Sequence, residues 1–143
     1  MSASFEFGFQ ATRSSPRALQ PAGSLATWQM RRVRHYIETN LTQDLLTNTL
    51  ADVVNLSPSH FCRAFKRSVG ITVHRYVMQR RVEKAQQLML TTAEALSSVA
   101  LSSGMSDQSH LTRWFRRVVG VTPAAWRRAR CEPSNLTREG RAR

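Results

Sequence analysis

Cysteine is scarce in this sequence, and its scarcity excludes several common kinds of site. The 143 residues include only Cys62 and Cys131, and neither belongs to a C-x-x-C or a Cys/His zinc spacing. We therefore expect a reduced, cytoplasmic protein that holds no metal and uses no cofactor.

Long apolar runs are also missing. No stretch approaches the roughly 18 residues of a membrane-spanning helix. Residues 1–24 lack the basic start and the continuous apolar core of a signal peptide. The sequence thus predicts a protein that is neither inserted in a membrane nor secreted.

Acidic residues are few, so the charge of the chain has one dominant sign. Nine Asp and Glu stand against 21 Lys and Arg, which gives a net charge of +12. Between Ala26 and Cys131 there are sixteen basic and six acidic residues, so +10 of this charge lies in one region. The sequence also contains no G-x-S-x-G, P-loop, H-E-x-x-H or paired-carboxylate arrangement. These features argue against an enzyme and favour a polyanionic partner.

What the sequence does contain is an internal repeat, offset by fifty positions. Five residues of the first copy have identical counterparts in the second: Ser59, His60, Arg63, Phe65 and Arg67 correspond to Ser109, His110, Arg113, Phe115 and Arg117. After each stretch a Gly-x-Thr triplet follows, Gly70-Ile71-Thr72 and Gly120-Val121-Thr122. We therefore expect two related structural units in one chain.

Each copy has the pattern of a helix with two different faces. Ser57 and Asp107 are short polar side chains that can cap the first turn. At 3.6 residues per turn, the apolar stripes are Phe61, Phe65 and Val69, and Leu111, Phe115 and Val119. The opposite stripes are small, polar and cationic: Ser59, Cys62, Arg63 and Lys66, and Ser109, Thr112, Arg113 and Arg116. On a single helix such a stripe would usually be a solvated face, but its repetition favours two helices that enter a DNA groove.

The remaining periodicity predicts an all-α protein of about seven helices. The expected spans are 25–40, 47–54, 57–67, 73–90, 93–102, 107–117 and a last helix after Thr122-Pro123. Thr47 or Asn48 is the expected cap of the second helix, and Thr91 or Thr92 that of the fifth. The first turn, Val54-Asn55-Leu56, should be one residue tighter than its counterpart. The expected organisation is a flexible leader (1–24), a helix-turn-helix with its linker helix (25–90), a second helix-turn-helix (91–131) and a flexible tail (132–143).

These residues resemble the DNA-binding domain of AraC/XylS-type transcription regulators from about Leu25 to Arg130. The resemblance is carried by Leu50-Ala51, by Leu56-Ser57-x-x-His60-Phe61-x-Arg63-x-Phe65-Lys66, by Arg81…Ala85…Leu88-Met89, and by Gly104-Met105-Ser106-Asp107-Gln108-Ser109-His110-Leu111-x-Arg113-x-Phe115-Arg116 with Gly120-Val121-Thr122-Pro123 and Trp126-Arg127. It implies a sequence-specific regulator that inserts the third and the sixth of these expected helices, residues 57–67 and 107–117, into successive major grooves.

The resemblance also implies roles for individual residues. The positions that read bases correspond to Ser59, Cys62, Arg63, Gln108, Ser109, Thr112 and Arg113. We expect phosphate contacts from Ser57, His60, Lys66, Arg67, His110, Arg116 and Arg117. His60 and His110 are not expected to bind a metal, because no third ligand lies at a suitable spacing.

Two departures from the family pattern matter. Met105 stands where many members have phenylalanine and should only repack the turn. Cys62 stands where several have a longer polar residue, and its thiol is a poor hydrogen-bond partner for a base.

The expected partners are double-stranded DNA, bound by a monomer, and RNA polymerase. The alternative is a basic protein that binds RNA or DNA without sequence specificity. The family often carries a sensor or dimerisation domain on the N-terminal side, for which residues 1–24 are too few. A small stand-alone regulator and a regulator without its sensor both remain open, with the former slightly favoured.

Overall fold

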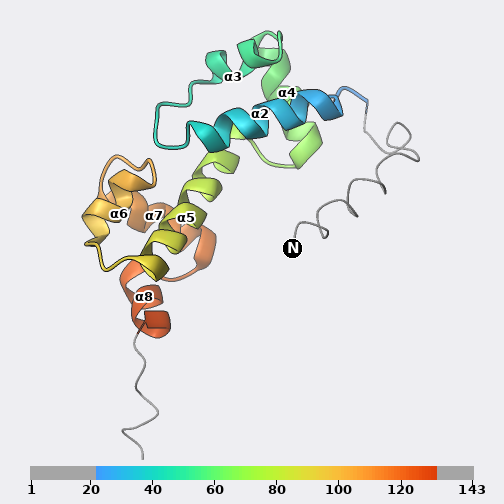
Figure 1. Cartoon of the computed structure of the whole chain (residues 1–143). Helices are drawn as coiled ribbons and strands as arrows, with labels where there is room; N and C mark the ends of the chain where they lie inside the picture. Colours follow the sequence, from blue (N-terminus) through green and yellow to red (C-terminus); the bar gives the residue numbers. More distant parts are fainter. Residues whose placement is uncertain (1–21, 132–143) are drawn as a thin grey trace, which may run out of the picture.

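The computed structural model describes residues 22–131, and this part of the chain is all-α (Figure 1). Its seven helices are α2 (Thr27–Thr39), α3 (Thr47–Val53), α4 (Pro58–Val69), α5 (Val73–Thr91), α6 (Leu96–Ser102), α7 (Gln108–Val119) and α8 (Pro123–Cys131). The fold class predicted from the sequence is thereby confirmed. Most helix ends agree with the expected spans within one or two residues, which is the ordinary uncertainty of a helix boundary.

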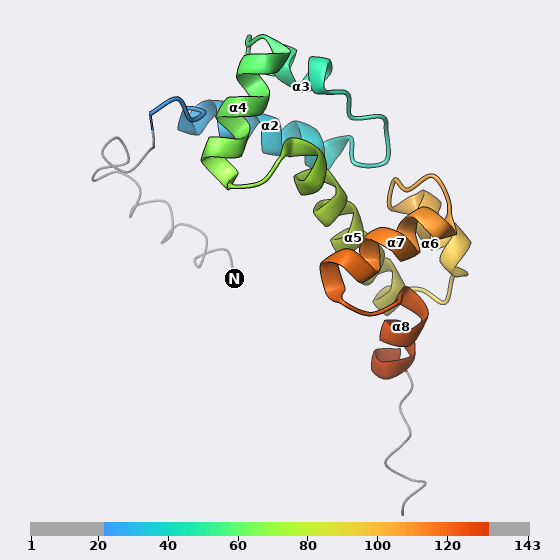
Figure 2. The same ribbon diagram turned by 180° about the vertical axis from the view of Figure 1, so that it is seen from behind.

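The helices form two halves joined by α5 (Figures 1 and 2). The first half packs α2, α3 and α4 around a core that includes Val33, Ile37, Phe61 and Phe65. The second packs α6, α7 and α8 around its own core. Helix α5 contributes to both cores, and the division falls between two consecutive residues: Val77 belongs to the first and Met78 to the second.

The internal repeat is visible as matched helix ends. Ser57 and Asp107 cap α4 and α7, because their side-chain oxygens accept hydrogen bonds from the backbone N–H groups of His60 (3.3 Å) and His110 (2.7 Å). At the other ends, Gly70 and Gly120 are left-handed, with φ of 86° and 94°. Residues other than glycine rarely adopt this backbone conformation, which explains a glycine at both positions.

Each half also holds its repeated helix, α4 or α7, with the same aromatic contact. Phe65 meets Tyr76 with ring centroids 5.5 Å apart, and Phe115 meets Trp126 at 5.7 Å, each edge to face at 71°. Tyr76 and Trp126 are themselves fifty positions apart. Edge-to-face pairs of this kind add stability beyond the area that they bury.

The two turns differ as expected. Between α3 and α4 the chain passes through residues 54–57, and between α6 and α7 through residues 103–107. In both turns a left-handed residue (Asn55, φ 57°; Gly104, φ 91°) precedes a residue whose N–H returns to the preceding helix. Leu56 N donates to Ala51 O and Met105 N to Ala100 O, at 3.0 and 2.9 Å. Met105 is buried, so it fills the turn without changing its hydrogen bonding.

The predicted start of the fifth span, residues 93–102, was wrong. Thr92 does not cap a helix at Ala93. It closes α5 instead, since its N–H and its hydroxyl both donate to Leu88 O. Helix α6 begins only at Leu96, and Arg127 donates to Glu94 O at 2.6 Å in the intervening segment. A contact from α8 thus overrides the local helix signal.

The expected cap of α3 was also wrong. Its N-cap is Leu46, which has no side-chain capping bond, so α3 begins at Thr47 without using Thr47 or Asn48 as a cap. The expected leader and tail lie outside the described residues, except for residues 22–24.

The buried aromatic stripe leads to a stability prediction. We expect Phe115→Ala to destabilise the protein by roughly 3–5 kcal/mol, because the ring is fully buried against Trp126 and its removal leaves a cavity. Chemical denaturation measures the loss. The control is Val118→Ala on the exposed side of the same helix, where about 0.5 kcal/mol or less is expected. Equal stability of the two variants would contradict the assignment of the faces.

Candidate nucleic-acid interface

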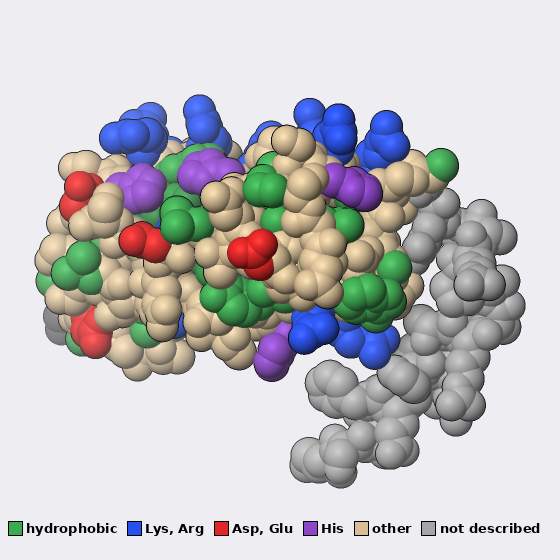
Figure 3. Space-filling model, turned by 90° about the horizontal axis from the view of Figure 1, so that it is seen from above, with side chains coloured by type: hydrophobic (Ala, Val, Ile, Leu, Met, Phe, Trp, Pro, Cys, Tyr) green, Lys and Arg blue, Asp and Glu red, His purple; other side chains and the backbone are tan. Residues whose placement is uncertain are grey.

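Helices α4 and α7 lie on the same side of the molecule. Both are nearest the viewer in Figure 2, whereas α2 and much of α5 lie behind them. Figure 3 shows the molecule from above, so that the side nearest the viewer in Figure 2 lies along its upper edge. Lys and Arg side chains gather in two groups along this edge, one over each half. The two repeated helices therefore present their cationic faces in a common direction.

The face of α7 brings together four of the predicted base-reading residues. Gln108, Ser109, Thr112 and Arg113 line one surface hollow of ≈ 660 Å³ together with Arg116. The hydroxyl of Thr112 donates to Gln108 O at 2.9 Å, which uses its hydrogen and leaves its oxygen as an acceptor. Arg113 is exposed. This arrangement brings uncharged polar groups and two guanidinium groups to one surface.

The face of α4 is similar but chemically poorer. Ser59, Cys62 and Arg63 are all exposed on it, so the structure brings the three predicted residues to one surface. Cys62 is a free thiol. Since a thiol is a weak hydrogen-bond donor and acceptor, Ser59 and Arg63 are the stronger polar groups of this helix.

The basic residues that were predicted to contact phosphate differ in their contacts within the protein. Lys66 and Arg116 are exposed near the ends of their helices. Arg67 is exposed too, but one of its nitrogens donates to Ala22 O at 3.1 Å. The guanidinium of Arg117 lies 5.0 Å from the ring centre of Trp114, within range of a cation–π contact. Both of these arginines are therefore held by a contact within the protein.

The two histidines at the helix starts differ because of the extra turn residue. Ser106, which the first turn lacks, donates its N–H to His110 Nδ1 at 3.2 Å, and its hydroxyl lies 3.1 Å from the same atom. The acceptor role of Nδ1 places the ring hydrogen on Nε2, where it can be donated to an anion. His60 is exposed. Burial, with the positive charge of Arg113, lowers the pKa of His110.

Trp114 and Ser106 contact predicted site residues, Arg117 and His110, and were not predicted from the sequence. Trp114 supports Arg117 on one side and meets His74 of α5 edge to face at 5.6 Å. The counterpart of Trp114 in the first copy is the small buried residue Ala64, so the repeat gave no indication of this role. The signal for Ser106 was available, because it is the one inserted residue between the two turns.

The structure also bears on other kinds of site. Across residues 22–131, no three His, Cys, Asp or Glu side chains come together in a group that could hold a metal ion. None of the helices in this described part is long and apolar enough to cross a membrane.

The lowered pKa of His110 leads to a pH prediction. The folded protein binds this proton less tightly than the unfolded chain, so the stability contributed by neutral His110 is present above pH 6.5 and is lost as the pH falls through the folded pKa. The free energy of unfolding, measured between pH 7.5 and about 5, should fall less steeply for His110→Gln than for the wild type. His60→Gln, which removes the exposed histidine at the same position of the first copy, is the matched control. An unchanged slope in His110→Gln would contradict this prediction.

Comparison with known proteins agrees with this geometry. A family model described as a helix-turn-helix domain matches residues 50–129. The bifunctional transcriptional activator/DNA repair enzyme AdaA of Bacillus subtilis is 34% identical over 95 residues, which are 66% of this chain and 45% of AdaA. The chain spans less than half of the length of the first curated relatives that it matches.

Solved structures extend the likeness to the whole architecture. An AraC-type regulator from Chromobacterium violaceum superposes with a TM-score of 0.68 at 25% identity, covering 74% of this chain and 95% of that one. The DNA-binding domain of AdpA, solved in complex with a target DNA, superposes with a TM-score of 0.67 at 29% identity, covering 71% and 91%. The family model and these structures together cover both helix-turn-helix units and the linker helix. The chain therefore belongs to the AraC-type family of helix-turn-helix DNA-binding domains.

Proposed function

We propose that this protein is a sequence-specific transcription regulator that places α4 and α7 in two successive major grooves of duplex DNA. The observation that carries this proposal is the common direction of two capped helices with exposed polar and cationic faces. A major groove about 12 Å wide admits one helix, and base edges there distinguish all four base pairs.

The dimensions of the linker support the same conclusion. Helix α5 has 19 residues, which at 1.5 Å per residue is about 28 Å. Successive major grooves on one face of DNA are about 34 Å apart. The name of the AdpA structure, which includes a target DNA, and the name of AdaA, which includes transcriptional activation, support DNA binding and regulation by this chain.

Roles follow for the residues of the two faces. We assign base contacts to Ser59, Cys62, Arg63, Gln108, Ser109, Thr112 and Arg113. Phosphate contacts are assigned to Ser57, His60, Lys66, Arg67, His110, Arg116 and Arg117. The capped N-termini of α4 and α7 add backbone N–H groups that favour phosphate.

The proposal extends to partners and class. Two recognition helices in one chain support binding as a monomer, and a regulator of this kind would contact RNA polymerase and act in the cytoplasm, where the DNA lies. We propose a non-enzymatic role, since the matched 95 residues of AdaA correspond here to a DNA-binding fold. The alternative is a basic protein that binds RNA or DNA without sequence specificity, for which the net charge of +12 is the supporting observation.

Selection of bound duplexes from a random pool tests the function. We expect two unlike short elements in direct order, about 10 base pairs apart centre to centre, with one chain per duplex. A palindromic motif with two chains per duplex would contradict the monomer. If no motif is enriched, and single-stranded RNA competes as well as duplex DNA, the non-specific alternative is correct.

Arg113 leads to a prediction about base reading. Its guanidinium can donate two parallel hydrogen bonds to O6 and N7 of a guanine, which lysine cannot do. Arg113→Ala and Arg113→Lys should each weaken binding to the selected site by roughly 1–3 kcal/mol and relax the preference at one base pair. Arg128→Ala, which removes an exposed charge from α8, should leave that preference intact. Equal weakening on all sequences, with a shallower salt dependence, would mean that Arg113 contacts phosphate instead.

A further inference from the structure

One backbone carbonyl lies where the two halves of the protein meet. Leu41 follows α2, and its oxygen accepts a hydrogen bond at 3.0 Å from Nε of Arg81, which belongs to α5. Nη2 of the same guanidinium donates to Gln43 O at 2.8 Å. Arg81 thus ties the loop between α2 and α3 to the linker helix through two donors in a fixed planar geometry.

The second half reaches the same point through Gly104, in the turn between α6 and α7. A Cβ at Gly104 would lie 2.3 Å from Leu41 O and 2.9 Å from Arg81 Nε, closer than real Cβ atoms approach. Gly104 also has φ of 91°, which disfavours a side chain. This glycine therefore serves two needs: the local turn, and close approach to the loop of the first half.

The environment of Arg81 is consistent with a structural contact and not a solvated charge. Burial lowers the pKa of its guanidinium, and the negative charge of Asp44 acts in the opposite sense. Burying a charge is costly unless hydrogen bonds compensate it, and the carbonyls of Leu41 and Gln43 supply them. These hydrogen bonds stabilise the protein only while the loop, α5 and the turn keep their relative positions.

Most of the other contacts that relate the two halves, within the described residues, are made through α5. The extensive helix–helix contacts lie within each half or onto α5. A second direct link is the edge-to-face pair of His74, near the start of α5, and Trp114 of α7. Together with the shared helix, these contacts place α7 relative to α4.

We propose that Arg81 and Gly104 are positioning residues that set the distance and the rotational phase between the two recognition helices. They would thereby determine which spacing of the two half-sites the protein accepts. This inference rests on the proposed function, since it concerns the same two helices. Neither residue is assigned a contact with DNA.

The helical geometry of DNA makes this property measurable. A full turn of 10–10.5 base pairs spans about 34–36 Å, so one inserted base pair shifts a half-site by about 3.4 Å and rotates it by about 35°. A rigid pair of recognition helices cannot follow this change without losing contacts. A pair joined only by α5 can adapt its orientation at less cost.

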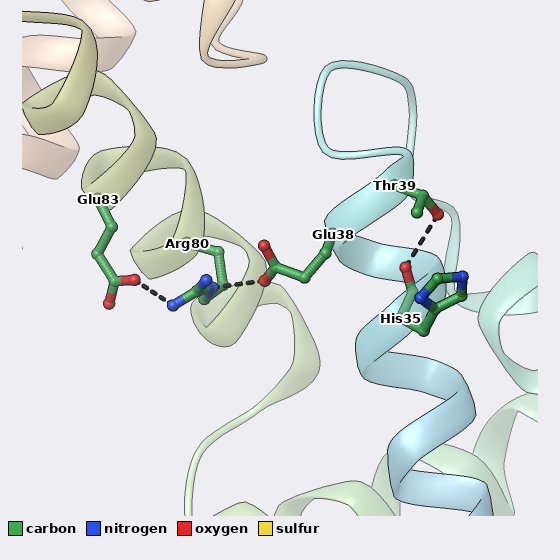
Figure 4. Close-up of polar contacts among 5 residues, drawn as sticks. All are labelled: His35, Glu38, Thr39, Arg80 and Glu83. Carbon is green, nitrogen blue, oxygen red and sulfur yellow. Dashed lines mark hydrogen bonds and ion pairs between the residues drawn. The ribbon is translucent and has the colours of Figure 1, made fainter. Parts of the chain in front are cut away.

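The experiment measures the affinity of the full chain for a series of duplexes. The selected site is synthesised with its native spacing and with one or two base pairs inserted or deleted between the half-sites. The variants are Arg81→Met, which keeps an apolar stem but removes the donors, and Gly104→Ala. The matched control is Arg80→Gln. It removes the same charge one position earlier and breaks ion pairs to Glu38 and Glu83, which lie in the first half and on α5 itself (Figure 4).

The wild type and Arg80→Gln should bind the native spacing at least about tenfold more tightly than a spacing changed by one base pair. In Arg81→Met and Gly104→Ala this ratio should fall to about twofold or less, with affinity for an isolated half-site unchanged. Thermal melting of each variant is measured alongside, so that the ratio is read only on folded protein.

Two results would overturn the inference. The first is a full spacing preference in folded Arg81→Met. The second needs no variant: wild-type protein that accepts one added or deleted base pair with less than about twofold loss has no fixed register to explain. Failure of the proposed function is distinguishable from both, because selection would then return no two-part site from which to build the duplexes.

Discussion

The structure depends on one helix that belongs to two hydrophobic cores. Val73 and Val77 of α5 pack with the first half, and Met78, Val82, Ala85 and Met89 pack with the second. Because a helix is stiff over this length, the halves cannot change their separation without removing side chains from one core. Each half is also too small to bury a large core alone, so sharing α5 serves stability as well as geometry. Core packing on α5 therefore limits the separation of α4 and α7, and the contacts of Arg81 and Gly104 act within that limit.

The two halves share the same helix ends and buried aromatic contacts, but their exposed side chains differ. Caps, left-handed glycines and an edge-to-face aromatic pair recur with nearly the same geometry. On the exposed faces, Cys62 corresponds to Thr112, so a thiol in one half corresponds to a hydroxyl in the other. Trp114 replaces the small buried Ala64 and supports Arg117. These differences support two unlike half-sites, with the richer set of polar contacts on α7.

Much of the fold was predictable from local pattern. The buried stripe through Phe61 and Phe65 and that through Leu111 and Phe115 follow from helical periodicity alone, and all four rings or side chains are fully buried. The caps at Ser57 and Asp107 were predictable for the same reason, since a cap is a contact over three residues. Prediction failed between α5 and α6, where Thr92 returns to Leu88 and Arg127 of α8 holds Glu94. No local pattern contains a hydrogen bond across 33 positions.

By itself, the sequence determined the two units, their faces, their turns and the excess of positive charge. Each of these depends on residues close together in the chain, or on composition. Only the tertiary structure decided how the units stand relative to each other. That arrangement depends on Arg81 reaching the carbonyls of Leu41 and Gln43, and on Gly104 packing against the first of them. These atoms are about forty or more positions apart, and two of them are backbone oxygens, which carry no signature in a sequence of side chains.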